Sequence, residues 1–351
     1  MIRHSKPNIK RADLASVLEN LVTDNIADGA MVRDFEKAFC EFYGQRGGAA
    51  VAVGSGLDAL FFGLTALGIG PGDEVILPSY LPPAPYLAVT HCGAAPVLCD
   101  IGPDYNISAE SARACITERT KAVIAAHLFG MPADLAALSE LGVPIIEDCA
   151  QALGARYRGE LVGSTGRFSF VSFHASKMIT TGYGGMFFSK DTRLCAAVRD
   201  IRSYSTREDL SPAWNSNITD FQAAMGINQL KSLPRFIEQR RQIAEIYTER
   251  FLQAHIEIPH TFEGRECVWY RYPIRVKHSL KGALDYLRKN TIEGKSPIPR
   301  PLHQMAGLLS EGYPESEKAF LKTLSIPIYP ALLNKEVEHI AKVAAHVSAI
   351  Q

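Results

Sequence analysis

The sequence predicts a two-domain α/β protein, in which a large domain with a mostly parallel sheet is followed by a smaller α+β domain. Short apolar runs alternate with helical stretches between residues 49 and 189. Near-continuous apolar strands separated by helices are typical of a parallel sheet that is covered on both faces. After that region the alternation gives way to long helical patterns. A chain of 351 residues is long enough for both domains.

The expected strands are short, rich in β-branched and aromatic residues, and bounded by turn residues. They cover residues 49–53, 74–78, 95–100, 121–129, 143–148, 168–173 and 184–189. Amphipathic segments at 57–68 and 107–116 are expected to be helices that connect them.

The C-terminal third begins with a long helical region. Thr219 followed by Gln222 is a capping box, which predicts a helix to about Leu233. Pro234 is then expected to open a second, longer helix, because proline suits the first turn. The apolar stripe of that helix includes Ile243, Tyr247 and Phe251.

The remainder of the C-terminal third contains one clear strand pattern, at residues 268–276, and two helices. The second helix starts behind Asn334 and aligns Val337, Ile340 and Ala344 on one face. We place the domain boundary near residue 235. The large domain, including the N-terminal segment, is then residues 1–235, and the small domain is residues 236–351.

The composition excludes several classes of partner. Lys plus Arg (37) equals Asp plus Glu (37), so nothing favours nucleic acid or an anionic membrane. No run of 18 apolar residues occurs, and residues 1–14 lack the apolar core of a secretory signal. Seven single cysteines indicate reduced thiols, and the spacing of the ten histidines predicts no metal site. We therefore expect a cytoplasmic protein.

Two strand ends carry candidate binding residues. Residues 53–60 (VGSGLDAL) form a strand, a Gly turn and a helix start, where unpaired N–H groups can meet a phosphate. Such turns are also common as purely structural links. Residues 143–148 (VPIIED) form an apolar strand that ends in Asp148, at the edge where α/β sheets bind ligands. The alternative for Asp148 is a cap on the next helix.

Lys177 is the candidate reactive residue. It lies between an apolar strand and a Gly-rich turn in residues 170–185 (FVSFHASKMITTGYGG). Lysines in such desolvated places form Schiff bases with carbonyl compounds, although a surface lysine at a strand end is the plain alternative. The phosphate turn, the acid and the lysine occur in the order that a pyridoxal-5'-phosphate (PLP) site needs.

Three longer segments resemble the DegT/DnrJ/StrS family of sugar aminotransferases: residues 147–155 (EDCAQALGA), 172–185 (SFHASKMITTGYGG) and 215–230 (NSNITDFQAAMGINQL). Residues 70–80, 127–135, 301–304 and 324–330 extend the resemblance over nearly the whole chain. Members of this family are PLP enzymes of fold type I, the aspartate-aminotransferase fold, that act on nucleotide-linked keto-sugars. The resemblance implies amino transfer from glutamate or glutamine to a keto-sugar or a related cyclic ketone.

The resemblance also implies residue roles. Lys177 corresponds to the imine lysine, which is the proton shuttle, and Asp148 to the partner of the pyridine nitrogen. Gln151 corresponds to the group that lies against the cofactor ring. Ser172 corresponds to a phosphate ligand, opposite the backbone of Gly56 and Leu57.

The matching asparagine, Asn215, reaches the phosphate from the neighbouring subunit in this family, which implies a homodimer with shared sites. His174 also fits the family motif, but the resemblance gives it no role beyond packing near the lysine.

Four positions depart from the family pattern. Where the family has a threonine in the phosphate turn, this chain has Leu57, which keeps the N–H group but lacks the hydroxyl. The family has an aromatic residue that stacks on the pyridine where this chain has Pro82. Tyr80 or Tyr86 is expected to take its place. This chain has Tyr183 where the family has a glutamate after the lysine. It has Asn217 where the family has an arginine, two residues beyond the dimer-contact asparagine.

The last two departures remove charges from the substrate mouth. We expect Tyr80, Tyr183 and Asn217 near the substrate, with Arg300 or His303 of the small domain compensating for the lost charge. The alternative is an acceptor that lacks the nucleotide altogether.

Other functions remain open. Dehydration or elimination could run on the same scaffold, but the family's dehydratase branch replaces the lysine with histidine. A PLP-binding regulatory protein is a second alternative, which the intact pair Asp148 and Lys177 disfavours. A Rossmann dehydrogenase is disfavoured because the Gly-rich run at 68–73 precedes a strand, whereas the dinucleotide fingerprint follows one.

Overall fold

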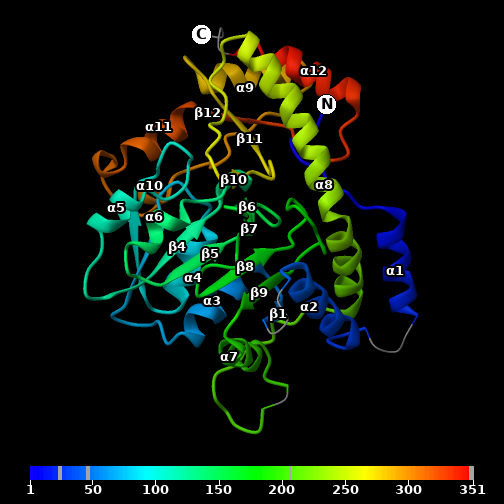
Figure 1. Ribbon diagram of the computed structural model, residues 1–351, viewed down its shortest axis with the longest axis vertical. Coiled ribbons are helices and arrows are strands. Elements are labelled where there is room, and N and C mark those ends of the chain that lie inside the picture. Colours follow the sequence, from blue (N-terminus) through cyan, green and yellow to red (C-terminus); the bar gives the residue numbers. More distant parts are fainter. Residues whose placement is uncertain (23–25, 45–47, 206, 348–351) are drawn as a thin grey trace.

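The computed structural model describes residues 1–22, 26–44, 48–205 and 207–347. A seven-stranded sheet with helices on both faces forms the lower part of the molecule, and a smaller unit built on two strands lies above it (Figure 1). Within the described residues, no helix combines the length and apolar character needed to cross a bilayer.

The large sheet is mostly parallel, as predicted. Its strands follow the order β1 (Ala49–Val53), β9 (Gly185–Ser189), β8 (Phe168–Ser172), β5 (Ile145–Asp148), β4 (Thr120–Ala126), β2 (Glu74–Pro78) and β3 (Ala95–Cys99). Only β9 runs against its neighbours, and every other pair in this sheet is parallel. The carboxyl ends of β1, β8, β5 and β4 therefore meet at one edge.

Alternate residues of each strand face opposite cores. In β1, Val51 and Val53 point to one core, whereas Ala50 and Ala52 point to the other. The first core is covered by α3 (Gly56–Ala66), α4 (Ala84–His91) and α7 (Thr192–Arg202). The opposite face is covered by α2 (Ala30–Phe42), α5 (Ala109–Ala114), α6 (Leu135–Ser139) and the first half of α8 (Asp220–Gln253), and α1 (Arg11–Leu21) packs outside α8.

The smaller unit has its own core. The antiparallel strands β11 (Tyr272–Arg275) and β12 (Thr323–Ile326) pack with α9 (Leu280–Lys289), α12 (Asn334–Ala344) and the second half of α8. The helices α10 (Leu302–Met305) and α11 (Pro314–Lys322) join this unit to the large sheet. Three two-residue strands, β6 (Arg156–Tyr157), β7 (Glu160–Leu161) and β10 (Arg265–Glu266), form a separate small sheet.

Pro234 does not open a helix, so that prediction is wrong. The capping box at Thr219 and Gln222 is confirmed, but the helix that it starts, α8, runs without interruption to Gln253 and contains Pro234. Proline inside a helix loses one hydrogen bond. Leu233 and Phe236 on either side of it are fully buried, and this packing holds the helix together. α8 thus passes through the boundary near residue 235, which stays a prediction.

The predicted strand at 268–276 is also shorter than expected. Only Tyr272–Arg275 is a strand, and Trp269 has a φ of 53°. The preceding residues bond to the loop after β4 instead: Val268 N–H donates to Gly130 O at 3.1 Å and Arg271 N–H to Phe129 O at 3.2 Å. The described part of the C-terminal third holds α9, α10, α11 and α12 where the sequence predicted two helices.

Candidate active site

The candidate residues gather at the carboxyl edge of the sheet. Asp148 ends β5 and Gln151 follows it, Ser172 ends β8 and Lys177 lies in the loop that follows, and Gly56 opens the helix after β1. Since these strands are parallel or related through β9, their following loops converge on one place.

The N-terminus of α3 lies directly against Ser172. A Cβ atom at Gly56 would lie 2.9 Å from Ser172 Cβ, so only glycine allows this approach. Ser55 caps the helix by accepting from Asp58 N–H at 3.1 Å. The N–H groups of Gly56 and Leu57 precede the first intrahelical bond and remain as donors beside the Ser172 hydroxyl. This cradle has the donor set that a phosphate needs.

Asp148 is a buried carboxylate with spare acceptor capacity. Its Oδ1 accepts from Ala150 N–H at 2.9 Å, and none of the hydrogen bonds found among the described residues uses Oδ2. Burial raises the pKa of Asp148, while the Ala150 N–H group and the nearby Lys177 and His127 act in the opposite direction. A buried acid in this state is stabilised by a cationic partner.

Gln151 is oriented by the loop after β4. Its Oε1 accepts from Phe129 N–H at 2.9 Å, and Phe129 has a φ of 61°, which turns that N–H group toward the site. The Gln151 side chain is thereby tied to the loop after β4.

The loop that carries Lys177 is closed at its base. Phe173 N–H donates to Gly184 O at 2.8 Å and Thr181 N–H to Phe173 O at 3.1 Å. Inside the loop, Lys177 N–H donates to His174 O at 2.9 Å. None of the ion pairs among the described residues includes Lys177. Its amine lies 5.5 Å from the ring centroid of Tyr270.

Glu147, next to Asp148, points into the opposite core and is saturated with donors. Its oxygens accept from the N–H groups of Gly163, Thr165 and Gly166 at 2.6–2.8 Å. His127 Nε2 lies 3.1 Å from the same carboxylate, and its Nδ1 accepts from Ala133 N–H at 3.0 Å. Burial raises the pKa of Glu147, but these hydrogen bonds outweigh it and hold that pKa low.

The side chains of His127, Glu147 and Cys149 come close enough together to suggest a metal site. Since the ring nitrogens of His127 and both oxygens of Glu147 already have protein partners, this pair anchors β5 structurally. The sequence analysis did not predict the contact between His127 and Glu147. Its only sign in the sequence is the acidic residue directly before Asp148.

The expected substrate residues fall into two groups. Tyr183 is 67% exposed and its ring lies 5.3 Å from that of His174, in the lysine loop. Asn217 Nδ2 donates to Ser203 Oγ at 3.2 Å, and Asn215 beside it is exposed. Arg300 is exposed and lines a cavity of about 370 Å³ together with Pro82.

Tyr80 and His303 are fully buried, so the structure does not bring them to a substrate mouth. Tyr80 packs against Tyr105 and Phe129 in the core. His303 bonds to Ser79 Oγ at 2.6 Å and to Glu317 at 2.8 Å, and therefore joins α10 to the large sheet. Their burial disfavours a contact with substrate, and the expectation stays a prediction.

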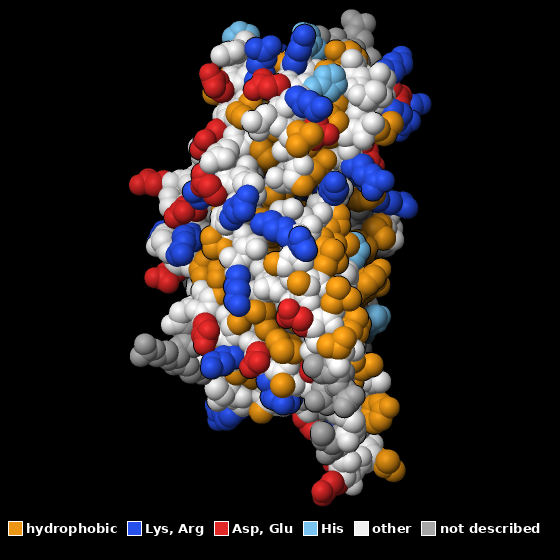
Figure 2. Space-filling model, turned by 90° about the vertical axis from the view of Figure 1, so that its right-hand side faces the viewer, with side chains coloured by type: hydrophobic (Ala, Val, Ile, Leu, Met, Phe, Trp, Pro, Cys, Tyr) orange, Lys and Arg blue, Asp and Glu red, His pale blue; other side chains and the backbone are white. Residues whose placement is uncertain are grey.

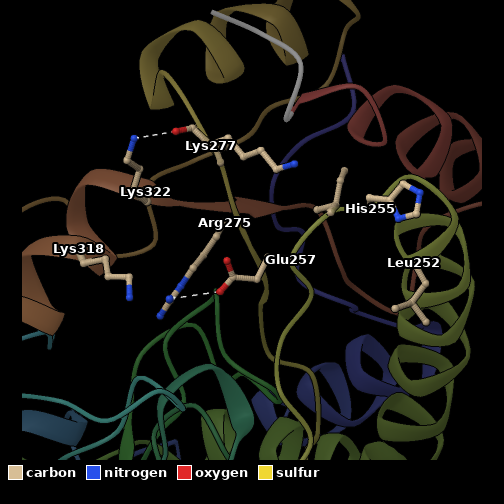
Figure 3. Close-up of a pocket in the computed structure, with 9 residues that line it drawn as sticks. Leu252, His255, Glu257, Arg275, Lys277, Lys318 and Lys322 are labelled. Atoms are coloured by element: carbon tan, nitrogen blue, oxygen red, sulfur yellow. Dashed lines mark hydrogen bonds and ion pairs between the residues drawn. The ribbon is translucent and has the colours of Figure 1, made fainter.

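A separate cavity of about 450 Å³ lies in the smaller unit and contains none of the predicted site residues. Figure 3 shows Arg275 and Glu257 pointing toward each other there, and their side chains are 3.2 Å apart. Lys322 Nζ donates to the carbonyl oxygens of Lys277 and His278. The charged groups of this cavity are thus largely engaged with the protein itself.

The residues at the sheet edge fit PLP. The α3 cradle suits its phosphate, Asp148 suits its pyridinium, and Lys177 supplies a primary amine that pairs with no acid in the described part of the chain. Fold and site together define a PLP-dependent transaminase.

Comparison with known proteins identifies the family. The model of the DegT/DnrJ/EryC1/StrS aminotransferase family matches residues 7–345, and the chain belongs to this family. GDP-perosamine synthase of Caulobacter vibrioides is 34% identical over 345 residues, 92% of each chain. The dTDP-3-amino-3,6-dideoxy-alpha-D-galactopyranose transaminase of Aneurinibacillus thermoaerophilus is 34% identical over 328 residues, 90% of this chain and 89% of that protein.

A solved structure agrees with this assignment. The PMP form of the putative sugar aminotransferase Spr1654 from Streptococcus pneumoniae superposes with a TM-score of 0.93 at 27% identity. The match covers 99% of this chain and 97% of that one.

Proposed function

We propose that this enzyme transfers an amino group from glutamate or glutamine to the ketone of a nucleotide-linked sugar. The observation that carries the proposal is the convergence of Asp148, Lys177 and the α3 cradle at one edge of the sheet. The two relatives named above, whose names specify GDP- and dTDP-linked sugars, support the acceptor class.

Each residue has a defined task in this proposal. PLP, when bound, supplies an electron sink for the carbon that carries the transferred nitrogen. The N–H groups of Gly56 and Leu57 and the Ser172 hydroxyl bind its phosphate. Asp148 would keep the pyridine nitrogen protonated, and Gln151 would lie against the ring. Lys177 would hold the aldehyde end of the cofactor, and its amine would carry the proton that the transfer requires.

In this proposal, few charged side chains bind the acceptor. Tyr183 and Asn217 are neutral, and Arg300 is the exposed cation of the cavity beside Pro82. We propose that Arg300 contributes to binding the diphosphate, since a guanidinium pairs well with phosphate oxygens.

We propose a homodimer whose sites are shared. The segment that carries Asn215 exposes several large apolar side chains that a second copy can cover: Tyr204, Leu210 and Trp214. A further apolar row, Leu14, Leu18 and Leu21, is exposed on α1. Figure 2 shows hydrophobic side chains gathered over the lower half of the face that carries α1. A stable and fully active monomer would contradict the shared site.

We also propose a cytoplasmic location. All seven cysteines are free thiols, which suits a reducing compartment.

The test of the proposed function separates its two half-reactions. PLP-loaded protein is mixed with glutamate or glutamine, and the 2-oxo acid formed is quantified together with the cofactor absorbance. We expect one equivalent of 2-oxo acid per site, and none with Lys177→Ala. GDP- or dTDP-linked keto-sugars should then restore the starting absorbance, whereas free ketones should not. If no amino acid yields a 2-oxo acid, the regulatory alternative is favoured. Acceptance of free ketones alone would reject the nucleotide-linked acceptor.

A further inference from the structure

Tyr270 reaches the lysine from the far end of the sequence. The segment that carries it crosses from the smaller unit and bonds to the loop after β4 through Val268 and Arg271. Its ring is buried, and the Lys177 amine lies over the ring, 5.5 Å from the centroid. The face of this aromatic ring is thus a close neighbour of the reactive amine.

The groups around this phenol are mainly cationic. Arg271 lies over the ring at 4.6 Å, and its Nη2 donates to the Tyr270 hydroxyl at 3.3 Å. Arg240 on α8 donates to the backbone oxygen of Tyr270 at 3.4 Å. Lys177 and Ser176 face the phenol from the lysine loop. No carboxylate is found among the described groups that act most strongly on it.

Arg271 is held in place by the N-terminal segment. His4 Nδ1 lies 2.9 Å from Arg271 Nη1, and His4 Nε2 lies 2.9 Å from Ser325 Oγ. Burial, with Arg271 and Lys295 nearby, lowers the pKa of His4 to about 2, so the ring stays neutral and accepts from Arg271. The N-terminus lies in the upper unit, consistent with this contact (Figure 1).

These surroundings make the phenol acidic. Burial alone would raise the pKa of Tyr270, but the charges of Lys177 and Arg271, the hydrogen bond with Ser176 and the charge of Arg240 together lower it to about 8. Tyr272, two residues along the chain, has a raised pKa because it is buried without such cations.

We propose that Tyr270 is the proton partner of Lys177, taking the proton that the lysine ammonium must lose before it can attack the PLP aldehyde. In this step the N–H bond of the ammonium breaks and an O–H bond forms on the phenolate. A neutral amine with a free electron pair and a neutral phenol result. The inference deepens the function proposed above, because it rests on Lys177 as the site of PLP attachment.

The experiment uses cofactor-free protein, with no amino donor or sugar present. Ultraviolet difference spectroscopy follows tyrosinate formation between about pH 6 and pH 11, a range that includes the reference pKa of tyrosine, about 10. We expect one tyrosine with a pKa of about 8. Its signal should be absent from Tyr270→Phe and present in the control Tyr272→Phe. In Lys177→Met, the same signal should move to higher pH, because one neighbouring cation is lost.

A second measurement links the phenol to the lysine. PLP is added to the same proteins, and the rate of its covalent capture is measured against pH by borohydride trapping and mass spectrometry. We expect Tyr270→Phe to capture PLP about 10- to 100-fold more slowly at pH 8, with Tyr272→Phe unchanged. Capture by Tyr270→Phe at the wild-type rate would overturn the proposal, as would a tyrosine signal that Lys177→Met does not move. PLP trapped on Lys177→Met would instead overturn the attachment site, and hence the proposed function.

Discussion

Glu147 and Asp148 are adjacent carboxylates on β5, and we expect their amide variants to fail in different ways. Each Glu147 oxygen accepts from two donors: Oε2 from Gly163 and His127, and Oε1 from Thr165 and Gly166. In Glu147→Gln one oxygen becomes an NH₂ group that faces two donors. With each buried donor left unpaired costing about 1–3 kcal/mol, the free energy of unfolding should fall by about 2–6 kcal/mol.

The assay is urea unfolding of the cofactor-free protein, with Asp148→Asn as the matched variant. Asp148 has one protein hydrogen bond that its amide can still accept, so Asp148→Asn should unfold near the wild-type midpoint. That variant should instead lose turnover by at least about 100-fold, because the pyridine nitrogen is no longer held protonated. A stability loss below about 1 kcal/mol in Glu147→Gln would refute the reasoning.

The measurement belongs at neutral pH. The folded-state pKa of Glu147 is lower than its unfolded value. The stability that ionised Glu147 contributes to the fold is therefore fully present above the unfolded pKa. It fades as the pH falls through the folded-state pKa, and the difference between wild type and Glu147→Gln should shrink in acid.

Three further predictions concern single residues. Lys177→Ala should lower turnover by at least about 100-fold while the unfolding midpoint stays near that of wild type, as steady-state kinetics and urea unfolding will show. Gly56→Ala should weaken PLP binding to cofactor-free protein in a fluorescence titration, since its Cβ would meet Ser172 at 2.9 Å; Gly312→Ala, with open space around it, is the control and should bind as wild type does. His303→Ala should lose about 2–4 kcal/mol of stability and keep the KM for the acceptor, because the ring is a buried tie; a raised KM with unchanged stability would restore His303 to the substrate mouth.

Local patterns were enough to predict the sheet and the residues that follow its strands. The expected strands correspond to β1, β2, β3, β4, β5, β8 and β9 within a few residues. Asp148, Ser172 and Lys177 each stand at or just beyond a strand end, where a parallel sheet concentrates chemistry. The spacing of apolar residues along the sequence is enough to predict where these strands lie and where they end.

Contacts between distant segments could not be predicted in this way. Pro234 looked like a helix start because proline favours the first turn, whereas the packing of Leu233 and Phe236 overrides that preference. Tyr270 belongs to an apparent strand, and only the hydrogen bonds of its segment with Phe129 and Gly130 bring it to the lysine. His303 has the residue type of a ligand-binding group, yet Ser79 and Glu317 occupy both of its nitrogens.

The contact of His4 with Arg271 and Ser325 has a consequence for biosynthesis. The partners of His4 lie 267 and 321 residues further along the chain. A ribosome must therefore have translated nearly the whole message before the first few residues can settle. A chain that ends between residues 177 and 270 would carry Lys177 without Tyr270 or its supporting arginine. Completion of the reactive pocket is in this sense deferred until the polypeptide is almost entirely made.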